Sequence, residues 1–353
     1  MSAATPAIIL GGTGYVAGEL LRLIAGHPQL SVAAILSDSQ PGAPVAGAFM
    51  HLRSAYPNLR FADLDEIETL IPSAPRCALF SAAPHGAAAA IIDRLLKAAQ
   101  AAGTRMHCVD ISADFRYSSP AAYEAVYKHA HGAPARISEF TCAVPEHLQK
   151  SPTPHVAHPG CFATATLLAT VPLLALRLTE PRLFVTGITG STGSGRKPMD
   201  GTHHPHRHSD FYSYGALSHR HVPEIIACAK LATGIEAEFN FVPHSGPFAR
   251  GIHVTVQASL KKSISTAQAL EALKSYYKDC PFVRVGDTAP RVKDVATSNY
   301  SHMSAVTNGN SIAVMSVVDN LNKGAAGGAI QWMNRLLGLA ETTGLTTPAP
   351  GWT

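Results

Sequence analysis

The chain has 353 residues, of which 46% are hydrophobic and 15% are charged, and its formal net charge is +4 at pH 7. This length and apolar content exclude an intrinsically disordered chain and predict a globular protein of about two domains. The small positive excess forms no Lys/Arg block typical of nucleic-acid binding, so we expect no nucleic-acid partner and consider an anionic small-molecule substrate a better match.

The first residues, MSAATPAIILGG, have no basic region and only a short apolar run, so they predict a first strand and not a secretory signal. No apolar run approaches the roughly 20 residues of a membrane span, and we expect no membrane partner. The cysteines are scattered without a CxxC pair, at Cys77, Cys108, Cys142, Cys161, Cys228 and Cys280. Reduced thiols in a cytoplasmic protein are the simplest interpretation.

Strands and helices alternate in the N-terminal part of the chain. Short apolar strands are predicted at 7–12, 30–38, 77–86 and 106–115, and helices at 16–28 and 87–103. This alternation is typical of parallel β-α-β units. It predicts an α/β fold that begins with a Rossmann-like, doubly wound dinucleotide-binding domain.

The pattern changes after about residue 157. A helix is predicted from Cys161, and a polar segment rich in glycine and histidine follows at 191–221. A strand is predicted at 182–190, and later strands with period-two stretches are predicted at 238–245, 250–260 and 311–320, with helices at 266–280 and 323–340. The mixture predicts a second, α+β domain whose later strands are antiparallel.

A glycine-rich loop, GGTGYVAGEL, lies between the first predicted strand and the first predicted helix. It has the form G-x-T-G-x-x-A, which brings backbone N–H groups and a helix N-terminus to a pyrophosphate. A plain glycine-rich turn is the other interpretation. The candidate cofactor contacts in this loop are Gly11, Thr13, Gly14, Tyr15 and Val16.

The end of the second strand bears on the type of cofactor. Asp38 lies about 20 residues after the glycine loop, where an acidic residue bonds a ribose 2′-hydroxyl and favours NAD. The flanking Ser37 and Ser39 could instead hold the 2′-phosphate of NADP, but no arginine stands beside them. These residues leave both cofactors open.

Cys161 stands in the stretch HPGCFATA, at the start of an apolar helix. The unpaired N–H groups and the positive dipole end of a helix lower the pKa of a thiol placed there. Free cysteine is also among the most buried residue types. The local sequence therefore leaves open whether Cys161 is a nucleophile or a core residue.

Six histidines lie in the segment THHPHRHSDFYSYGALSHRHVPEI. We predict no metal site, because no cysteine or HExxH motif accompanies them. The HRHVPEI part ends a loop and opens a helix, so His219 or His221 could act as a general acid/base beside a thiol. Two solvated loop histidines are the alternative.

Two segments could bind an anion. Arg116, in DISADFR, follows a strand of the first domain, where a guanidinium suits a phosphate or a carboxylate. The loop GSTGSGRKP carries Arg196. A surface salt bridge for Arg116 and a flexible connection for the loop are the alternatives.

Together these segments resemble one family, the N-acetyl-γ-glutamyl-phosphate reductases of arginine biosynthesis, which are related to aspartate-semialdehyde dehydrogenase. The resemblance runs nearly end to end, and the order and spacing of the motifs carry it. The motifs are GGTGYVAGELLRLIAGHP, APHG, DISADFR, HPGCFATA, GSTGSGRKP, HRHVPEI, FVPHSGPFARGI and VVDNLNKGAAGGAIQWMN.

The resemblance implies an NADPH-dependent reduction of N-acetyl-γ-glutamyl phosphate to N-acetylglutamate 5-semialdehyde, with release of phosphate, through a thioester on Cys161. His219 or His221 would exchange the proton, with a slight preference for His219, and Arg116 would bind the acyl phosphate. Further substrate contacts implied are Arg196, His244 and Arg250. Further cofactor contacts implied are Ser37, Ser39, Ser81, Pro84, Gly193 and Asn320.

The resemblance also implies how the chain is organised. The last helix would return to the N-terminal domain, so that 1–157 with 322–353 form the dinucleotide-binding domain and 158–321 form the catalytic and oligomerisation domain. We expect a homo-dimer or homo-tetramer. The alternatives are the same reaction on aspartyl phosphate or N-blocked aminoadipyl phosphate, a non-catalytic dinucleotide-binding regulator, and an alcohol dehydrogenase without a covalent intermediate.

Overall fold

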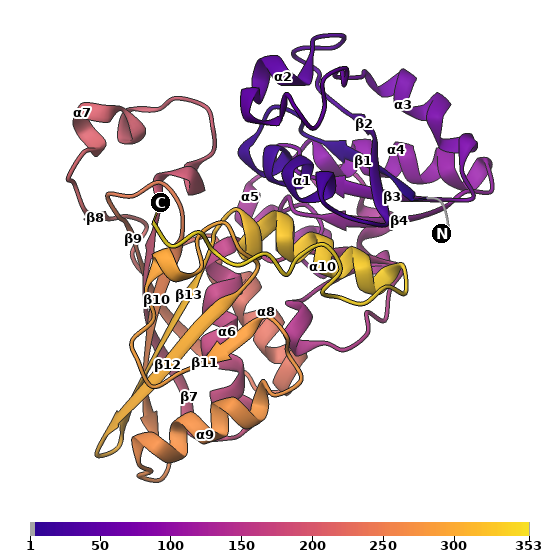
Figure 1. The fold of residues 1–353 in the computed structure, drawn as a ribbon. Helices are drawn as coiled ribbons and strands as arrows, with labels where there is room; N and C mark the ends of the chain where they lie inside the picture. Colours follow the sequence, from indigo (N-terminus) through magenta and orange to yellow (C-terminus); the bar gives the residue numbers. More distant parts are fainter. Residues whose placement is uncertain (1–3, 353) are drawn as a thin grey trace. The chain divides into compact units, whose positions relative to one another are not determined.

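The computed structural model describes residues 4–352. By contacts between residues the chain divides into two compact units (Figure 1). Unit 1 comprises the described residues up to Cys142, with Lys150–His158 and Ala329–Leu345; unit 2 comprises Ala143–Gln149, Pro159–Gly328 and the described residues from Thr346.

The units differ from the predicted domains in the short segments at the boundaries. Residues 143–149, 158, 322–328 and those after 345 fall in the other unit from the one expected. Residues 322–328 illustrate the reason. Asn322–Ala326 forms a π-helix that packs against the helix beginning at Cys161, and both lie in unit 2.

Unit 1 is built on a six-stranded parallel sheet in the order β2-β1-β3-β4-β6-β5. Its strands are β1 (Thr5–Leu10), β2 (Leu30–Ile35), β3 (Arg76–Ser81), β4 (Arg105–Asp110), β5 (Phe140–Cys142) and β6 (His155–Ala157). The strand order reverses at β1, as in a doubly wound sheet, so the predicted fold class is confirmed. This order brings the carboxyl ends of β1 and β3 side by side.

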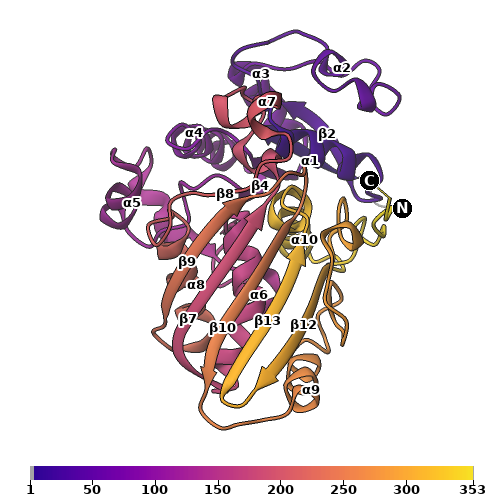
Figure 2. The ribbon, with the colours of Figure 1, turned by 90° about the vertical axis from the view of Figure 1, so that its left-hand side faces the viewer.

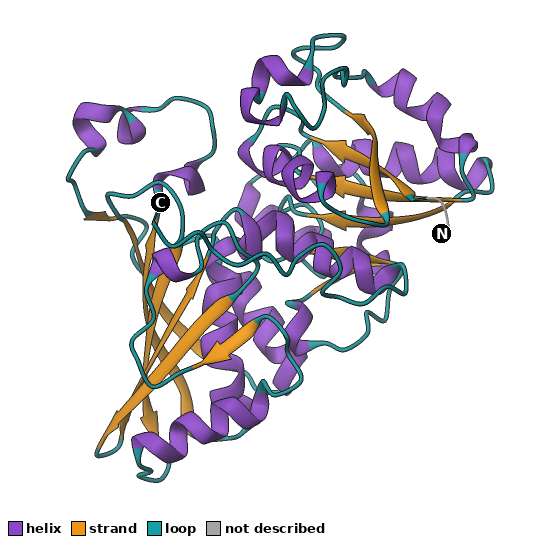
Figure 3. Cartoon of the chain, viewed as in Figure 1, coloured by secondary structure: helices purple, strands orange, loops and turns teal. Residues whose placement is uncertain are grey.

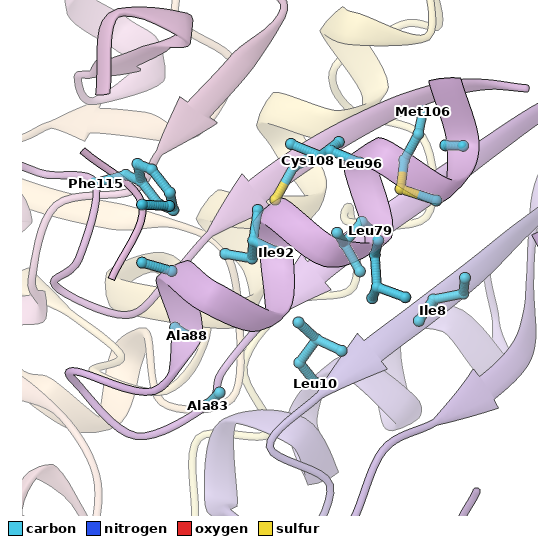
Figure 4. Close-up of a cluster of buried hydrophobic side chains, with 14 of the residues drawn as sticks. Ile8, Leu10, Leu79, Ala83, Ala88, Ile92, Leu96, Met106, Cys108 and Phe115 are labelled. Atoms are coloured by element: carbon cyan, nitrogen blue, oxygen red, sulfur yellow. The ribbon is translucent and has the colours of Figure 1, made fainter. Parts of the chain in front are cut away.

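Helices accompany this sheet, as Figure 3 shows by colour. They are α1 (Tyr15–Ala25), α2 (Val45–Ala48), α3 (Leu64–Leu70), α4 (Ala88–Ala101), α5 (Pro120–Tyr127) and, from Ala329 onward, α10 (Gly327–Leu336). Buried residues of α4, including Ala88, Ile92 and Leu96, recur with helical spacing and pack with Leu79 and Cys108 (Figure 4). The core of unit 1 therefore fixes the strand ends that carry the glycine loop.

Unit 2 is built on a seven-stranded mixed sheet in the order β11-β12-β13-β10-β7-β9-β8 (Figure 2). Its strands are β7 (Thr179–Thr189), β8 (Tyr212–Ser213), β9 (Glu238–Ser245), β10 (Ile252–Leu260), β11 (Val283–Val285), β12 (Ser301–Asn308) and β13 (Ser311–Val318). The antiparallel prediction is right for β10 and β13 but wrong for β9, which pairs with β7 in parallel. A crossover that contains a helix joins β7 to β9, and such connections join parallel strands.

The helices of unit 2 are α6 (Cys161–Ala175), α7 (His204–Arg207), α8 (Val222–Thr233) and α9 (Thr266–Tyr276). Helix α6 packs against α8 and against β7, β10 and β13. It is apolar all round, and every residue from Phe162 to Leu174 is buried. Cys161 therefore stands at the first position of a helix that is buried along most of its length.

The other face of this sheet has no helix over it in Figure 2. Side chains alternate along β7 between buried and exposed, and Phe184 on the open face is 48% exposed. Phe184 and Val306 line a groove of about 340 Å³ on this face. Phe184 and Val306 are thus apolar side chains that stay about half exposed on an open sheet face.

No helix among residues 4–352 is long and apolar enough to cross a membrane.

A buried histidine in unit 1 makes stability depend on pH. His155 of β6 is 5% exposed, and its Nδ1 accepts a hydrogen bond from the Cys108 N–H (3.1 Å). Burial lowers the pKa of His155 to about 4, and the charges of His107 and Arg136 add to this effect. An unfolded chain, in which the pKa returns to 6.5, binds more protons between these values. Stability from this group is therefore complete above pH 6.5 and is lost as the pH falls toward 4.

We expect His155→Gln to reduce the slope of unfolding free energy against pH, between pH 6 and 5, by about 1 kcal/mol per pH unit. Urea unfolding at several pH values measures this slope. Exposed His51 provides the control, and His51→Gln should leave the slope unchanged. An unaltered slope in the His155 variant would mean that this imidazole is protonated in the folded state.

Candidate active site

Cys161 lies where a strand turns into a helix. Strand β6 ends at Ala157, and α6 begins at Cys161 after Gly160, which caps the helix without any side-chain hydrogen bond. Cys161 is partly exposed, whereas the residues that follow it are buried. The sulfur therefore occupies the first turn of a helix, next to N–H groups that have no intrahelical acceptor.

Cys161 lines a cavity of about 540 Å³ in unit 2, and both candidate histidines line it too. The rings of His219 and His221 have their centroids 4.7 Å apart, and the ring of Phe162 lies 5.8 Å from the first and 6.5 Å from the second. The cavity thus brings together the thiol and both imidazoles that the sequence singled out. The interpretation of Cys161 as a core residue does not fit this position.

The protonation of His219 follows from its surroundings. Its Nδ1 accepts a hydrogen bond from the backbone N–H of His221 (3.2 Å), so the hydrogen of the neutral ring is on Nε2. Burial lowers the pKa of His219 to about 4, and the charge of Arg220 adds to the effect. At neutral pH His219 is therefore an uncharged imidazole that can donate a hydrogen bond from Nε2.

The turn before Cys161 is packed against His221 and Glu224. Glu224 is fully buried in the first turn of α8, and its Oε1 accepts a hydrogen bond from the Gly160 N–H (2.8 Å). A β-carbon on Gly160 would lie 2.5 Å from His221 Nε2 and 2.8 Å from Glu224 Oε1. Only glycine fits between these groups, so α8 holds the turn that presents the thiol.

The π-helix Asn322–Ala326 approaches Cys161 from another side. A β-carbon on Gly324 would lie 2.8 Å from the β-carbon of Cys161. The neighbouring Lys323 is fully buried and pairs with Glu146 at 2.6 Å, so the π-helix is anchored by an ion pair without access to water. Such distorted helical turns are frequent at functional sites.

In unit 1 the glycine loop joins β1 to α1. Gly11 has φ +80°, and a β-carbon there would lie 2.3 Å from the carbonyl oxygen of Ala82. Gly14 caps α1 without a side-chain hydrogen bond, and no acidic residue stands in the first turn. The positive end of α1 is therefore not capped by its N-cap residue and has no carboxylate in its first turn, which suits a phosphate-binding turn.

The other predicted cofactor residues of unit 1 lie near strand ends. Ser81 is the last residue of β3 and is fully buried, while Pro84 follows in the next loop. Ser37 is 5% exposed, and its Oγ lies 3.4 Å from Oγ of Ser39. Their place after parallel strands is where ligands bind in doubly wound sheets.

Arg116 also belongs to unit 1. It is 6% exposed, and its guanidinium donates to the carbonyl oxygens of His158 (3.0 Å) and Ile111 (2.7 Å). A surface salt bridge, the alternative considered from the sequence, is therefore wrong. These bonds hold the guanidinium in one orientation.

The remaining predicted residues of unit 2 border the cavity only in part. Gly193 lines it, whereas Arg196, His244, Arg250 and Asn320 do not. Arg250 forms a two-bond salt bridge with the fully buried Asp319 (2.9 and 3.0 Å). His244 stacks on Phe211, with ring centroids 5.0 Å apart.

Asn320 bridges two loops of unit 2. It accepts a hydrogen bond from the Gly251 N–H (2.7 Å) and donates to Thr192 Oγ1 (3.0 Å). Any role in binding stays a prediction for Arg196, His244, Arg250 and Asn320. The observed bonds give Arg250 and Asn320 a part in holding the loops together.

Among the lining residues that the sequence did not single out are Phe162, Met199, Tyr212, Tyr214, Ser218 and Arg220. Arg220 and Glu224 stand inside the HRHVPEI motif, so the motif was a usable signal for both. Met199, Tyr212 and Tyr214 come from the polar segment, where nothing local indicated a lining role.

Besides His219 with His221, the histidine-rich segment forms the ring pairs His203 with His206 and His204 with His208, with centroids 5.7 and 5.3 Å apart. Within residues 4–352, no group of three or more His, Cys, Asp or Glu is arranged to hold a metal ion.

Comparison with known proteins defines the class. The semialdehyde dehydrogenase NAD-binding domain model matches residues 6–150, and the semialdehyde dehydrogenase dimerisation domain model matches residues 161–320. A solved aspartate semialdehyde dehydrogenase II from Vibrio cholerae has the same fold, with a TM-score of 0.70 and 15% identity over 95% of this chain and 98% of that chain. The protein is thus an oxidoreductase of the semialdehyde dehydrogenase class, with a nicotinamide dinucleotide as its cofactor.

Curated relatives narrow the class to a family. An N-acetyl-gamma-glutamyl-phosphate reductase of Pseudomonas savastanoi is 38% identical over 346 residues, covering 96% of this chain and 97% of the relative. One of Pseudomonas aeruginosa is 37% identical over 352 residues, covering 97% and 98%. The chain belongs to the N-acetyl-γ-glutamyl-phosphate reductase family, which confirms the predicted resemblance.

Proposed function

We propose that the protein reduces N-acetyl-γ-glutamyl phosphate to N-acetylglutamate 5-semialdehyde, with release of phosphate, as a step of arginine biosynthesis. One observation supports this most strongly: in a chain of this family, Cys161 begins a helix and shares a cavity with His219 and His221. An alcohol dehydrogenase without a covalent intermediate needs no thiol there, and a regulator without catalysis needs neither the thiol nor the histidines.

In the proposed mechanism the Cys161 sulfur attacks the acyl carbon of the substrate. A carbon–sulfur bond forms, the bond to the phosphate oxygen breaks, and inorganic phosphate leaves with the electron pair of that bond. The N–H groups at the start of α6 can stabilise the oxyanion formed during the attack, since they have no intrahelical acceptor. A thioester on Cys161 remains.

We assign different tasks to the two histidines. His219 is uncharged and has its hydrogen on Nε2, so it suits hydrogen bonding to the substrate oxygen. His221 is the group left to exchange the proton, first taking it from the thiol and later returning it as the aldehyde is released. The slight preference for His219 as the acid/base, made from the sequence, is thereby replaced.

Arg116 is proposed to bind the acyl-phosphate group. Its two bonds to carbonyl oxygens orient the guanidinium, and an arginine held in this way matches the paired oxygens of a phosphate. Arg196, His244 and Arg250 are also proposed as substrate contacts, although none of them lines the cavity.

The glycine loop fits a dinucleotide because Gly11 has no room for a side chain and α1 begins without a side-chain cap. When bound, the nicotinamide supplies the hydride that reduces the thioester. We propose Gly11, Thr13, Gly14, Tyr15 and Val16 as contacts of the phosphates. Ser81, Pro84, Gly193 and Asn320 are proposed as further contacts of the cofactor.

We further propose that NADP is the preferred form. Ser37 and Ser39 can both donate hydrogen bonds to a 2′-phosphate, and their hydroxyl oxygens already lie 3.4 Å apart.

The proposed function and the cofactor preference are both tested by a steady-state assay of N-acetylglutamate 5-semialdehyde oxidation with phosphate, run separately with NADP and NAD. No phosphate-dependent turnover with either cofactor would refute the function, and faster turnover with NAD would refute the preference.

We also propose that two copies pair through the open face of the unit 2 sheet. The groove that contains Phe184 and Val306 supports this, together with the match to a dimerisation domain.

A carboxylate inside such an interface would be left without water. We expect Val306→Glu to sediment as a monomer and Met50→Glu, at an exposed position of unit 1, to sediment like the wild type; equal sedimentation of all three would contradict this.

A further inference from the structure

In the part of the chain that the structure describes, the cavity beside Cys161 is lined by a positively charged side chain but by no carboxylate. Among the described residues that line it, Arg220 is the one arginine or lysine, and none is Asp or Glu. Glu224, four residues after Arg220, is fully buried and accepts a hydrogen bond from the Gly160 N–H. The cavity therefore offers a site for an anionic group and none for a free ammonium group.

Arg220 is held close to the reacting groups. Its backbone lies between the two histidines, whose own hydrogen bond, from the His221 N–H to His219 Nδ1, fixes the turn. Burial raises the pKa of Tyr214, with the charge of Cys161 adding to this effect and that of Arg220 opposing it. The charges of Cys161 and Arg220 therefore both influence the pKa of the same side chain, Tyr214, which lines the cavity.

Another arginine of the same region is engaged elsewhere. Arg250 forms its two-bond salt bridge with Asp319 and does not line the cavity, and neither does Arg196. The cavity is also lined by Phe162, Met199 and Tyr212, whose apolar surfaces suit methylene and acyl groups. A ligand with a carboxylate at one end and an apolar, uncharged substituent matches these walls.

We infer that Arg220 binds the α-carboxylate of the substrate and is the residue that selects it. This inference rests on the proposed function. The γ-acyl carbon must reach Cys161, and the α-carboxylate stands at the other end of a short carbon chain. Arg220 and Cys161 line the same cavity, so one small molecule can contact both. A guanidinium can hold a carboxylate through two parallel hydrogen bonds.

The test compares Arg220→Gln with the wild type on two aldehydes. One is N-acetylglutamate 5-semialdehyde, and the other is 4-acetamidobutanal, which lacks the α-carboxylate. We expect the KM for the first to rise about 10- to 100-fold, because a charged hydrogen bond is lost, with kcat changing little. The KM for the second should stay the same, and Arg220→Lys should recover part of the loss.

Arg291 supplies the control, because it is exposed in unit 2 and pairs with Asp294 three residues on. Arg291→Gln should leave both KM values unchanged. An equal loss on both aldehydes in Arg220→Gln, or an unchanged KM for the carboxylate-bearing one, would overturn the role of Arg220. A wild type inactive on N-acetylglutamate 5-semialdehyde would refute the proposed function, and the inference with it.

Discussion

Replacing Cys161 with serine is expected to reduce turnover by about 10³-fold or more, the largest effect of any single change in this protein. A serine hydroxyl at the start of α6 is far less ionised than a thiol and is a weaker nucleophile toward an acyl phosphate. Because Cys161 is partly exposed and the two side chains are similar in size, the fold should be preserved. The measurement is phosphate-dependent oxidation of N-acetylglutamate 5-semialdehyde at saturating cofactor.

Cys280 provides a matched control for this substitution. It is also a partly exposed free cysteine of unit 2, and it does not line the cavity. Cys280→Ser should keep turnover within a few-fold of the wild type. Near wild-type turnover in Cys161→Ser would mean that the reaction does not proceed through a bond to this sulfur.

Replacing His221 with glutamine is expected to have the second largest effect, a loss of about 10²- to 10⁴-fold in kcat. Glutamine can form hydrogen bonds but cannot exchange a proton near neutral pH, so the limb of the pH profile that reports this exchange should disappear. His219→Gln should cost about 10²- to 10³-fold, as for a lost oxyanion donor, and leave the shape of the profile above pH 5 intact.

The separation of the two profiles tests the assignment of the histidines. His219 has a pKa of about 4, so its own titration falls below the pH range in which the enzyme would be assayed. If the pH limb disappears in His219→Gln and persists in His221→Gln, the two roles are the reverse of those proposed. Circular dichroism of both variants would check that the turn into α8 still forms.

The sequence was informative where local pattern decides the structure. Strands such as β1 and β3 are buried on both faces, so they stand out as short apolar runs between helices. β12 (Ser301–Asn308), in contrast, was not predicted. Its residues mix Ser, His and Thr with apolar side chains, and its pairing with β13 and β11 fixes it as a strand. The three-residue strands β5 and β6 are too short to give a pattern.

In the candidate active site, too, local sequence patterns were informative and long-range contacts could not be predicted. The predicted helix start made Cys161 a candidate nucleophile, because such a position changes thiol chemistry, but the local sequence alone left a core position open as well. The HRHVPEI motif points to the neighbourhood of Arg220, but the sequence does not show that Arg220 lines the cavity while Arg196 and Arg250 do not. Lys323 and Glu146 are 177 positions apart, and nothing near either residue indicates that they form a buried ion pair behind the thiol.

The most direct test of the account is to trap the acyl group on the enzyme. Protein free of reduced cofactor would be mixed with N-acetyl-γ-glutamyl phosphate, digested and weighed by mass spectrometry. We expect one N-acetylglutamyl group on the peptide that contains Cys161, and its release as aldehyde when NADPH is added. Full turnover by an enzyme that never carries this group, or carries it on another residue, would contradict the account.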